Sequence, residues 1–207
     1  MARLFDFPRS SASYRVRIAC NLKAVAYDKV LVNFREHAQR SAEYLEVNPS
    51  GLVPAFESDD GTVLSQSLAI LKFLDTVSAT PRLFPADPKE ESAVWEMALI
   101  IACDIHPLNN LRVLKYLENT LGADEAARDA WYANWVSLGF EGLEARAKAR
   151  GASYCYGDAP TAVDVCLVPQ MFNARRFNVT LDAFPTLVDI DARLQQMDAF
   201  AKAAPDQ

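Results

Sequence analysis

The first candidate for chemistry in this chain is the segment FPRSSASYRVRIACN at residues 7–21. It follows a short apolar run that Pro8 interrupts, and it continues with apolar residues at helical spacing. A helix that begins here leaves its first backbone N–H groups without partners, and the hydroxyls of Ser10 and Ser11 can accept from them as an ordinary N-cap. The same turn also suits an anion, because a helix N-terminus and the nearby guanidinium of Arg9 both stabilise a carboxylate or a thiolate. Both interpretations stay open at this point.

The composition limits the classes of function. The chain has 207 residues, of which 51% are hydrophobic, so it can bury a sizeable core as one large domain or two small ones. The net charge of −6 argues against general nucleic-acid binding, which needs a basic surface. No apolar run is long enough to cross a membrane, and the first residues lack a secretion-signal pattern. We therefore expect a cytoplasmic protein with no membrane or nucleic-acid partner.

The cysteines argue against a metal site. No Cys-x-x-Cys pair is present, and the chain has only two histidines, so a zinc-finger-like site is excluded. Each cysteine has apolar neighbours, which favours buried, reduced thiols. These residues are Cys20, Cys103, Cys155 and Cys166.

The first 80 residues predict the element order β-α-β-α-β-β-α. The expected strands are residues 3–7, 27–32, 53–57 and 62–64, and the expected helices are residues 11–23, 41–45 and a third that opens at residues 65–67. Asp59-Asp60-Gly61 is a hairpin turn signal between the last two strands. This order predicts a mixed four-stranded sheet covered by helices, the thioredoxin-like arrangement.

A proline-rich segment separates this α/β part from an all-α part. Three prolines between residues 79 and 88 predict a linker, which we place at residues 81–88. Beyond it we expect one long helix or two over residues 89–118, and further helices at residues 124–150, from residue 161 and at residues 185–197. Thr161 and Asp164 form a capping-box pattern. The predicted domains are thus residues 1–80, thioredoxin-like, and residues 89–207, all-helical.

Several separated motifs resemble one family. They are RSSASYRVRIA at residues 9–19, NPSGLVP at 48–54, LSQSLAI at 64–70, CDIHPLNNLRVLKYL at 103–117 and GDAPTAVDVCLVPQ at 157–170. Together they resemble a cytosolic glutathione transferase, and within that superfamily the zeta class, which includes maleylacetoacetate and maleylpyruvate isomerases. The likeness covers essentially the whole chain and implies the glutathione transferase architecture. Ala12 departs from the pattern, since the family usually has cysteine there, and Leu111 and Arg112 fall where members vary.

The resemblance implies a glutathione-binding set in the first domain. The Val53-Pro54 peptide bond is cis in the family, which turns the Val53 backbone toward the cysteinyl part of glutathione, and X-Pro is the common place for a cis bond. Gln66 and Ser67 would hold the γ-glutamyl carboxylate at a helix start, and Gln39 would contact the peptide. The alternatives are a trans proline that starts a strand, a plain serine cap and a solvated glutamine.

The same resemblance assigns the thiol to Ser10. A free thiol has a pKa of about 8.5, so little of it is ionised at neutral pH. Hydrogen bonds and a helix N-terminus favour the thiolate. Ser10 would donate to the sulfur, Ser11 would support the turn, and Arg9 would add positive potential or bind a substrate carboxylate; an exposed arginine is the alternative for Arg9.

The helical part contributes fewer candidates. His106 and Asn110 are one helical turn apart and would share a face toward glutathione, although a structural histidine is an equal alternative. Arg112 and Arg176 are candidates for the substrate carboxylates. The family has an arginine just before the phenylalanine at 177, so Arg176 matches the pattern and Arg175 does not; a surface pair is the alternative.

The leading hypothesis is an enzyme that isomerises a maleyl-type diketo acid, maleylacetoacetate or maleylpyruvate, with glutathione as the catalytic nucleophile. A second hypothesis is a glutathione transferase that conjugates or dehalogenates small electrophilic acids. A third is a transferase-like binding module without catalysis. The resemblance also implies a homodimer.

Overall fold

The computed structural model describes residues 1–205 of the chain and contains two compact units. The first unit comprises Met1–Leu83 together with the described residues from Met197 onward, and the second unit is Phe84–Gln196. The sequence-based division differs here, because it assigned the C-terminal residues to the helical domain.

The C-terminal segment packs against α1 of the first unit through hydrogen bonds and a buried ring. The side chain of Arg17 is buried and donates from Nε to the carbonyl oxygen of Ala203 at 2.8 Å. Tyr14 donates from its hydroxyl to the carbonyl oxygen of Phe200 at 3.4 Å. Phe200 itself is fully buried. These contacts join residues that lie 186 positions apart in the sequence.

The first unit is built on a mixed four-stranded sheet, as predicted. Its strands are β1 (Ala2–Asp6), β2 (Tyr27–Leu31), β3 (Ala55–Glu57) and β4 (Val63–Ser65), in the spatial order β2-β1-β3-β4. β1 and β2 pair in parallel, and the other two pairings are antiparallel. The parallel pair results from the crossover through the first helix, which a β-α-β order requires.

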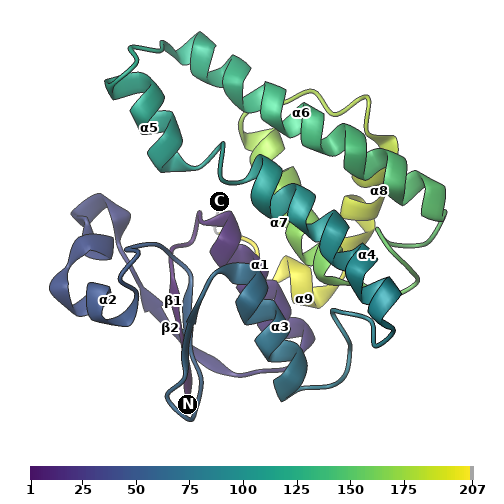
Figure 1. Cartoon of the computed structure of the whole chain (residues 1–207), viewed down its shortest axis with the longest axis horizontal. Coiled ribbons are helices and arrows are strands. Elements are labelled where there is room, and N and C mark those ends of the chain that lie inside the picture. The colour runs from purple at the N-terminus through teal and green to yellow at the C-terminus, as the bar shows by residue number, and fades with distance from the viewer. Residues whose placement is uncertain (206–207) are drawn as a thin grey trace. The chain divides into compact units, whose positions relative to one another are not determined.

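Helices cover both faces of this sheet. They are α1 (Ser11–Leu22), α2 (Ala42–Val47), α3 (Ser67–Val77) and the short α9 (Asp198–Ala201), with 3₁₀ turns η1 (Phe34–Glu36) and η2 (Ala38–Arg40) between β2 and α2. α1 and α3 lie on one face and α2 on the other (Figure 1). On the α2 face, the rings of Phe5 and Tyr44 are 5.8 Å apart, and on the other face those of Phe56 and Phe73 are 6.3 Å apart.

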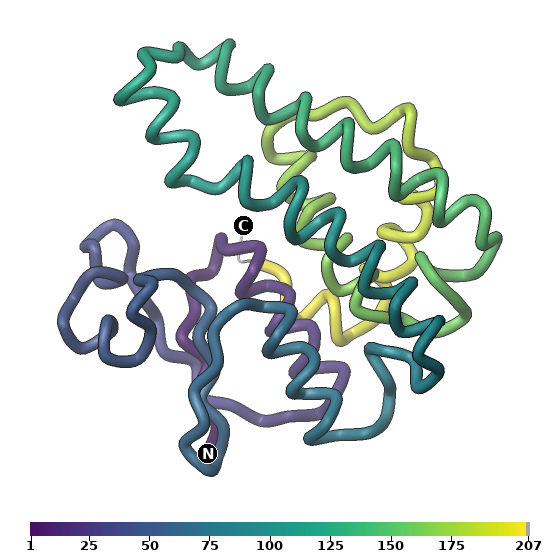
Figure 2. The backbone as a smooth tube through the Cα atoms, in the orientation of Figure 1, coloured from purple at the N-terminus to yellow at the C-terminus, as the bar shows by residue number. Residues whose placement is uncertain are grey.

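The second unit is all-helical, as expected. It contains α4 (Pro88–Leu99), the π-helical turn η3 (Ile100–Ile105), α5 (Leu111–Asn119), α6 (Glu125–Arg150), α7 (Ala162–Arg176) and α8 (Pro185–Leu194). The segment predicted as one helix or two is therefore two helices with a π turn between them. Figure 2 shows α5 turning back into α6. Gly139 of α6 allows η3 to approach closely, because a Cβ there would meet Ile105 at 2.3 Å.

The start of α7 confirms the predicted capping box. The carboxylate of Asp164 is fully buried and accepts from the backbone N–H of Thr161 at 2.7 Å and from its hydroxyl at 3.0 Å. Its other oxygen accepts from the backbone N–H of Cys155 at 2.9 Å. Burial raises the pKa of Asp164, and these hydrogen bonds oppose that rise.

The cysteines are free, and three of the four are buried as expected. Burial raises the pKa of Cys20 to about 12, so this thiol is unreactive. Cys103 is exposed, which differs from the expectation, because η3 turns it outward from the helical unit. Within residues 1–205, no cluster of three potential metal ligands occurs, and no helix is long and apolar enough to span a bilayer.

Candidate functional site

Ser10 occupies the turn between β1 and α1. It is the N-cap of α1, and its Oγ accepts from the backbone N–H of Ser13 at 3.2 Å. Its own N–H donates to the carbonyl oxygen of Phe7 at 2.9 Å. The capping bond uses a lone pair of Oγ, and no acceptor for the hydroxyl proton lies within residues 1–205. The N-cap interpretation is therefore confirmed, and it leaves a proton available for an anion.

Arg17 holds the backbone of this turn. Its Nη2 donates to the carbonyl oxygen of Pro8 at 3.0 Å, and its Nη1 pairs with the buried carboxylate of Asp6 at 2.7 Å. The ring of Phe7 lies 5.0 Å from the ring of Phe34 in η1. The turn is thus fixed from both sides. Nothing in the residues around Arg17 predicted this role, because the burial of every position from residue 11 to residue 20 follows from the packing of α1 in the folded chain.

The neighbours of Ser10 differ in exposure. Ser11 is buried and already engaged in an interaction, which fits a role in supporting the turn. Arg9 is exposed, and no carboxylate among the described residues pairs with it. Ala12 is buried in the first turn of α1. α1 has no acidic residue in that turn, so nothing there offsets the positive end of the helix dipole.

The Val53–Pro54 peptide bond is cis in the structure. The preceding residue is held firmly, since the carbonyl oxygen of Leu52 accepts from the hydroxyl of Tyr44 at 2.5 Å and from Nδ2 of Asn48 at 2.7 Å. In the part of the chain that the structure describes, the backbone N–H and C=O of Val53 have no partner. These groups can pair with an extended peptide.

The start of α3 is a second polar feature of the first unit. Gln66 is the N-cap with φ at +71°, a conformation uncommon for a residue other than glycine, and its side chain makes no capping hydrogen bond. Ser67, the first helical residue, is 6% exposed, and its Oγ accepts from Nη1 of Arg15 at 3.2 Å. The helix therefore begins with free N–H groups, a hydroxyl and a guanidinium behind them, a combination that favours an anion.

Gln39 lies in η2 and is partly buried. Its Oε1 is buried, with no hydrogen-bond partner among residues 1–205. The alternative of a freely solvated side chain therefore does not hold for this atom.

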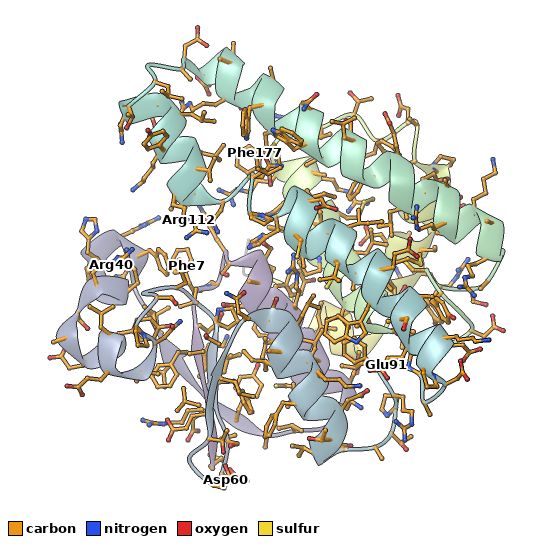
Figure 3. All side chains as sticks on the ribbon, in the orientation of Figure 1. Phe7, Arg40, Asp60, Glu91, Arg112 and Phe177 are labelled. Atoms are coloured by element: carbon orange, nitrogen blue, oxygen red, sulfur yellow. The ribbon has the colours of Figure 1, made fainter. Side chains whose placement is uncertain are left out.

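The candidates in the second unit occupy two segments. His106 ends η3 and is partly buried, with a partner of its own. Asn110 is the N-cap of α5, and its Oδ1 accepts from the backbone N–H of Arg112 at 3.1 Å. The prediction that His106 and Asn110 share one helical face is wrong, because the backbone leaves the helix between η3 and α5. Arg112 is exposed at the start of α5 (Figure 3).

Arg175 and Arg176 have different environments. Nη1 of Arg175 pairs with the fully buried carboxylate of Asp191 at 2.6 Å, so the two arginines are not a plain surface pair. The guanidinium of Arg176 lies 5.2 Å from the ring of Phe177, and that ring stacks at 3.9 Å on Tyr132 of α6 (Figure 3). Arg176 has no carboxylate partner within residues 1–205, so its charge is available to a ligand.

Tyr132 is a residue that the sequence did not reveal. It is 2% exposed, and burial raises its pKa to about 12, against the opposing effects of Gln170 and Arg176. Its backbone carbonyl accepts from Nδ2 of Asn109 at 3.3 Å. Tyr132 thus ties the residues before α5 and the end of α7 to α6. The available signal was a polar residue at a core position of a long helix.

The comparisons with known proteins agree with these features. A family model described as Glutathione S-transferase, N-terminal domain matches residues 9–77. A protein from Vibrio cholerae named "Probable maleylacetoacetate isomerase" is 44% identical over 205 residues, which cover 98% of this chain and 95% of that protein. A solved zeta-class structure, the holo form of a bacterial maleyl pyruvate isomerase, matches with 43% identity and a TM-score of 0.94, covering 98% of this chain and 96% of the other.

The chain belongs to the zeta class of the glutathione transferase family. A further solved member, a maleylacetoacetate isomerase from Methylobacterium extorquens AM1 with bound malonate and glutathione, is 33% identical with a TM-score of 0.93, covering 98% of this chain and 96% of the other. Eight candidate residues lie in the first unit: Arg9, Ser10 and Ser11 at the junction of β1 and α1, Gln39 in η2, Val53 and Pro54 just before β3, and Gln66 and Ser67 at the start of α3. The remaining four, His106, Asn110, Arg112 and Arg176, lie in its second unit.

Proposed function

We propose that this chain is a glutathione-dependent cis–trans isomerase of a maleyl-type diketo acid, either maleylacetoacetate or maleylpyruvate. The observation that carries the proposal is the Ser10 turn, with its free hydroxyl proton at the positive end of α1. The nearly full-length similarity to enzymes named for these two reactions supports the same conclusion.

The polar groups of the first unit fit glutathione, which has two carboxylates, an amine, a peptide backbone and a thiol. The N–H and C=O of Val53, which have no partner within residues 1–205, match the cysteinyl backbone, in the strand-like manner in which extended peptides pair. Gln66 and Ser67, at the uncapped start of α3, match the γ-glutamyl carboxylate. Gln39, whose buried Oε1 has no hydrogen-bond partner in the described part of the chain, matches an N–H donor of the peptide. We assign His106 and Asn110 as further contacts to glutathione.

The turn after β1 prepares the thiol. Bound glutathione supplies a thiolate that adds reversibly to the cis double bond and so permits rotation. The Ser10 hydroxyl donates a hydrogen bond to the sulfur, and the free N–H groups of α1 add positive potential. Both effects lower the pKa of the thiol. Ser11 keeps the turn in shape. Arg17 also stabilises the turn, because its Nη2 donates to the carbonyl oxygen of Pro8.

Three arginines are the proposed groups for the substrate. Arg9, Arg112 and Arg176 are all exposed and free of carboxylate partners within residues 1–205. A guanidinium suits bidentate carboxylate binding, and it stabilises negative charge that develops on the diketo group during the reaction. Such local positive charge is needed because the net charge of −6 repels an acidic substrate. The malonate bound to the Methylobacterium relative shows that a member of this class accepts a dicarboxylate.

An absorbance assay tests this function directly. Purified protein is mixed with maleylpyruvate or maleylacetoacetate, with and without glutathione, and the loss of the cis acid is followed together with the amount of free thiol. An isomerase removes the cis acid only when glutathione is present and leaves the thiol undiminished. A product that retains glutathione would instead identify a transferase, and no reaction with either acid would refute the proposal.

We further propose that the enzyme is a cytoplasmic homodimer. The proposal rests on the resemblance to zeta-class transferases, and the absence of a membrane-length helix among residues 1–205 is compatible with it.

A further inference from the structure

Among residues 1–205, the first unit contains three buried basic side chains, and one of them, Arg15, lacks a carboxylate partner there. Arg17 pairs with Asp6 at 2.7 Å, and Lys23 forms an ion pair with Asp75. Arg15 is 1% exposed, yet no carboxylate within residues 1–205 pairs with it. Its Nε and Nη2 are buried and have no hydrogen-bond partner in that part of the chain.

An unpaired buried guanidinium is costly. Removing a cation from water costs several kcal/mol unless a counter-ion and hydrogen bonds compensate. Buried charges in proteins are therefore usually paired, as Arg17 and Lys23 are here. The missing counter-ion of Arg15 indicates that a bound anion completes this part of the first unit.

The position of the guanidinium identifies where that anion binds. Nη1 of Arg15 donates to Oγ of Ser67 at 3.2 Å, directly at the first residue of α3. Because this bond occupies a lone pair of Oγ, the hydroxyl proton of Ser67 is turned away from Arg15 and is available to an acceptor. The same acceptor can take the backbone N–H groups of the first turn of α3, which has no side-chain cap.

We propose that Arg15 is a positioning residue for the carboxylate site at the start of α3, acting through Ser67 and supplying the charge that this site needs. The inference rests on the proposed function, in which this carboxylate is that of the γ-glutamyl residue of glutathione. Arg15 orients and polarises the Ser67 hydroxyl, since a donor that is itself hydrogen-bonded to a cation donates more strongly. It also offsets the negative charge of the ligand in a region that excludes water.

A binding cycle tests the role of Arg15. Isothermal titration calorimetry compares wild-type protein with Arg15→Met, using glutathione and an analogue in which the γ-glutamyl α-carboxylate is replaced by hydrogen. The Kd for glutathione should rise about 10- to 100-fold in Arg15→Met. The Kd for the analogue, which lacks the carboxylate, should change by less than about 3-fold. Equal losses for both ligands, or an unchanged Kd for glutathione, would overturn the inference.

Thermal unfolding separates this role from a structural one. Without ligand, Arg15→Met should unfold at the wild-type temperature or higher, because methionine replaces a buried charge that has no partner. The matched control is Arg17→Met, two positions along the same helix. That variant should unfold at a lower temperature, since the buried Asp6 loses its hydrogen-bonded partner and is left with Lys29 at 3.9 Å, and it should weaken both ligands equally. A lower melting temperature for unliganded Arg15→Met would show a structural role and contradict the proposal.

A conservative variant keeps the test decisive if Arg15→Met does not fold. Arg15→Lys retains the charge but lacks the forked donor group. Arg15→Lys should bind glutathione more tightly than Arg15→Gln, which has no charge. Both variants should bind the analogue with the same affinity. No difference between these two variants would refute the role of the charge. If wild-type protein fails to bind glutathione, both the proposed function and this inference are refuted. If the Arg15 variants bind glutathione as tightly as wild type, only the inference is refuted.

Discussion

Alanine substitutions of Arg175 and Arg176 should damage different properties, although the two residues are adjacent. Arg175→Ala removes the partner of a carboxylate that is fully buried, whereas Arg176→Ala removes a side chain that pairs with no carboxylate within residues 1–205. We expect the first substitution to lower stability and the second to weaken substrate binding.

The contacts of Asp191 set the size of the stability effect. Breaking a buried ion pair typically costs about 3–5 kcal/mol. Arg175 is 43% exposed, and Nε2 of Gln195 remains on the carboxylate at 2.9 Å, so the loss should be smaller. We expect about 2 kcal/mol, which for a chain of this length lowers the melting temperature by about 4–8 °C. Arg176→Ala loses its contact with the Phe177 ring and its electrostatic effect on Tyr132, and its cost should stay below about 1 kcal/mol.

The pH dependence follows from the carboxyl group. Burial raises the pKa of Asp191, and the charge of Arg175 opposes that rise. In Arg175→Ala the opposing charge is gone, so the pKa rises further. A carboxyl group with a raised folded-state pKa binds its proton more tightly in the native state, so stability falls as the pH rises through the window above its usual value. The deficit of Arg175→Ala should therefore be full at neutral pH and shrink in mild acid.

Two measurements check these expectations together. Thermal unfolding of both variants across this pH range gives the stability effect, and isomerase kinetics give the KM for the maleyl acid. Arg176→Ala should raise that KM about 10- to 100-fold without changing the affinity for glutathione. Arg175→Ala in an Asp191→Asn background should cost little, because no buried charge remains. An equal loss of stability in the two single variants, or a stability deficit of Arg175→Ala that does not change with pH, would refute the reasoning. Equal KM values for the two variants would show that Arg176 does not bind the substrate.

Three further expectations concern other parts of the enzyme. Ser10→Ala should lower kcat strongly and glutathione affinity only modestly, and it should weaken the thiolate absorbance of bound glutathione. The missing N-cap should lower the free energy of unfolding by about 1 kcal/mol. An unchanged thiolate absorbance would assign the activation of the thiol to Ser11 instead. Asp164→Ala should destabilise the protein by about 3 kcal/mol in denaturant unfolding, because the N–H groups of Thr161 and Cys155 lose a buried acceptor, whereas a loss no larger than for a surface substitution would contradict this account. Light scattering at low concentration should give twice the mass of one chain, and a single-chain mass would reject the homodimer.

Much of the fold was predictable because its signals are local. Short apolar segments and turn residues predicted all four strands, and the serine at position 10 marked the start of α1. The Thr161 and Asp164 pattern marked the start of α7. A helix end needs a hydroxyl or carboxylate within three residues of its free N–H groups, so such a pattern is visible in the sequence. The candidate residues on these segments could be named for the same reason.

Tertiary structure decided the partners of the charged side chains. The residue type of Arg15, Arg17, Arg175 and Arg176 does not reveal their partners. Among residues 1–205, folding buries the first without a carboxylate, pairs the second with Asp6 and the third with Asp191, and leaves the fourth with no carboxylate partner. The pairing of Arg17 with the Ala203 carbonyl likewise links positions 186 residues apart. The energy of a charge depends on whether water or a counter-ion surrounds it. That environment is assembled from segments remote in sequence, so it exists only once the chain has folded.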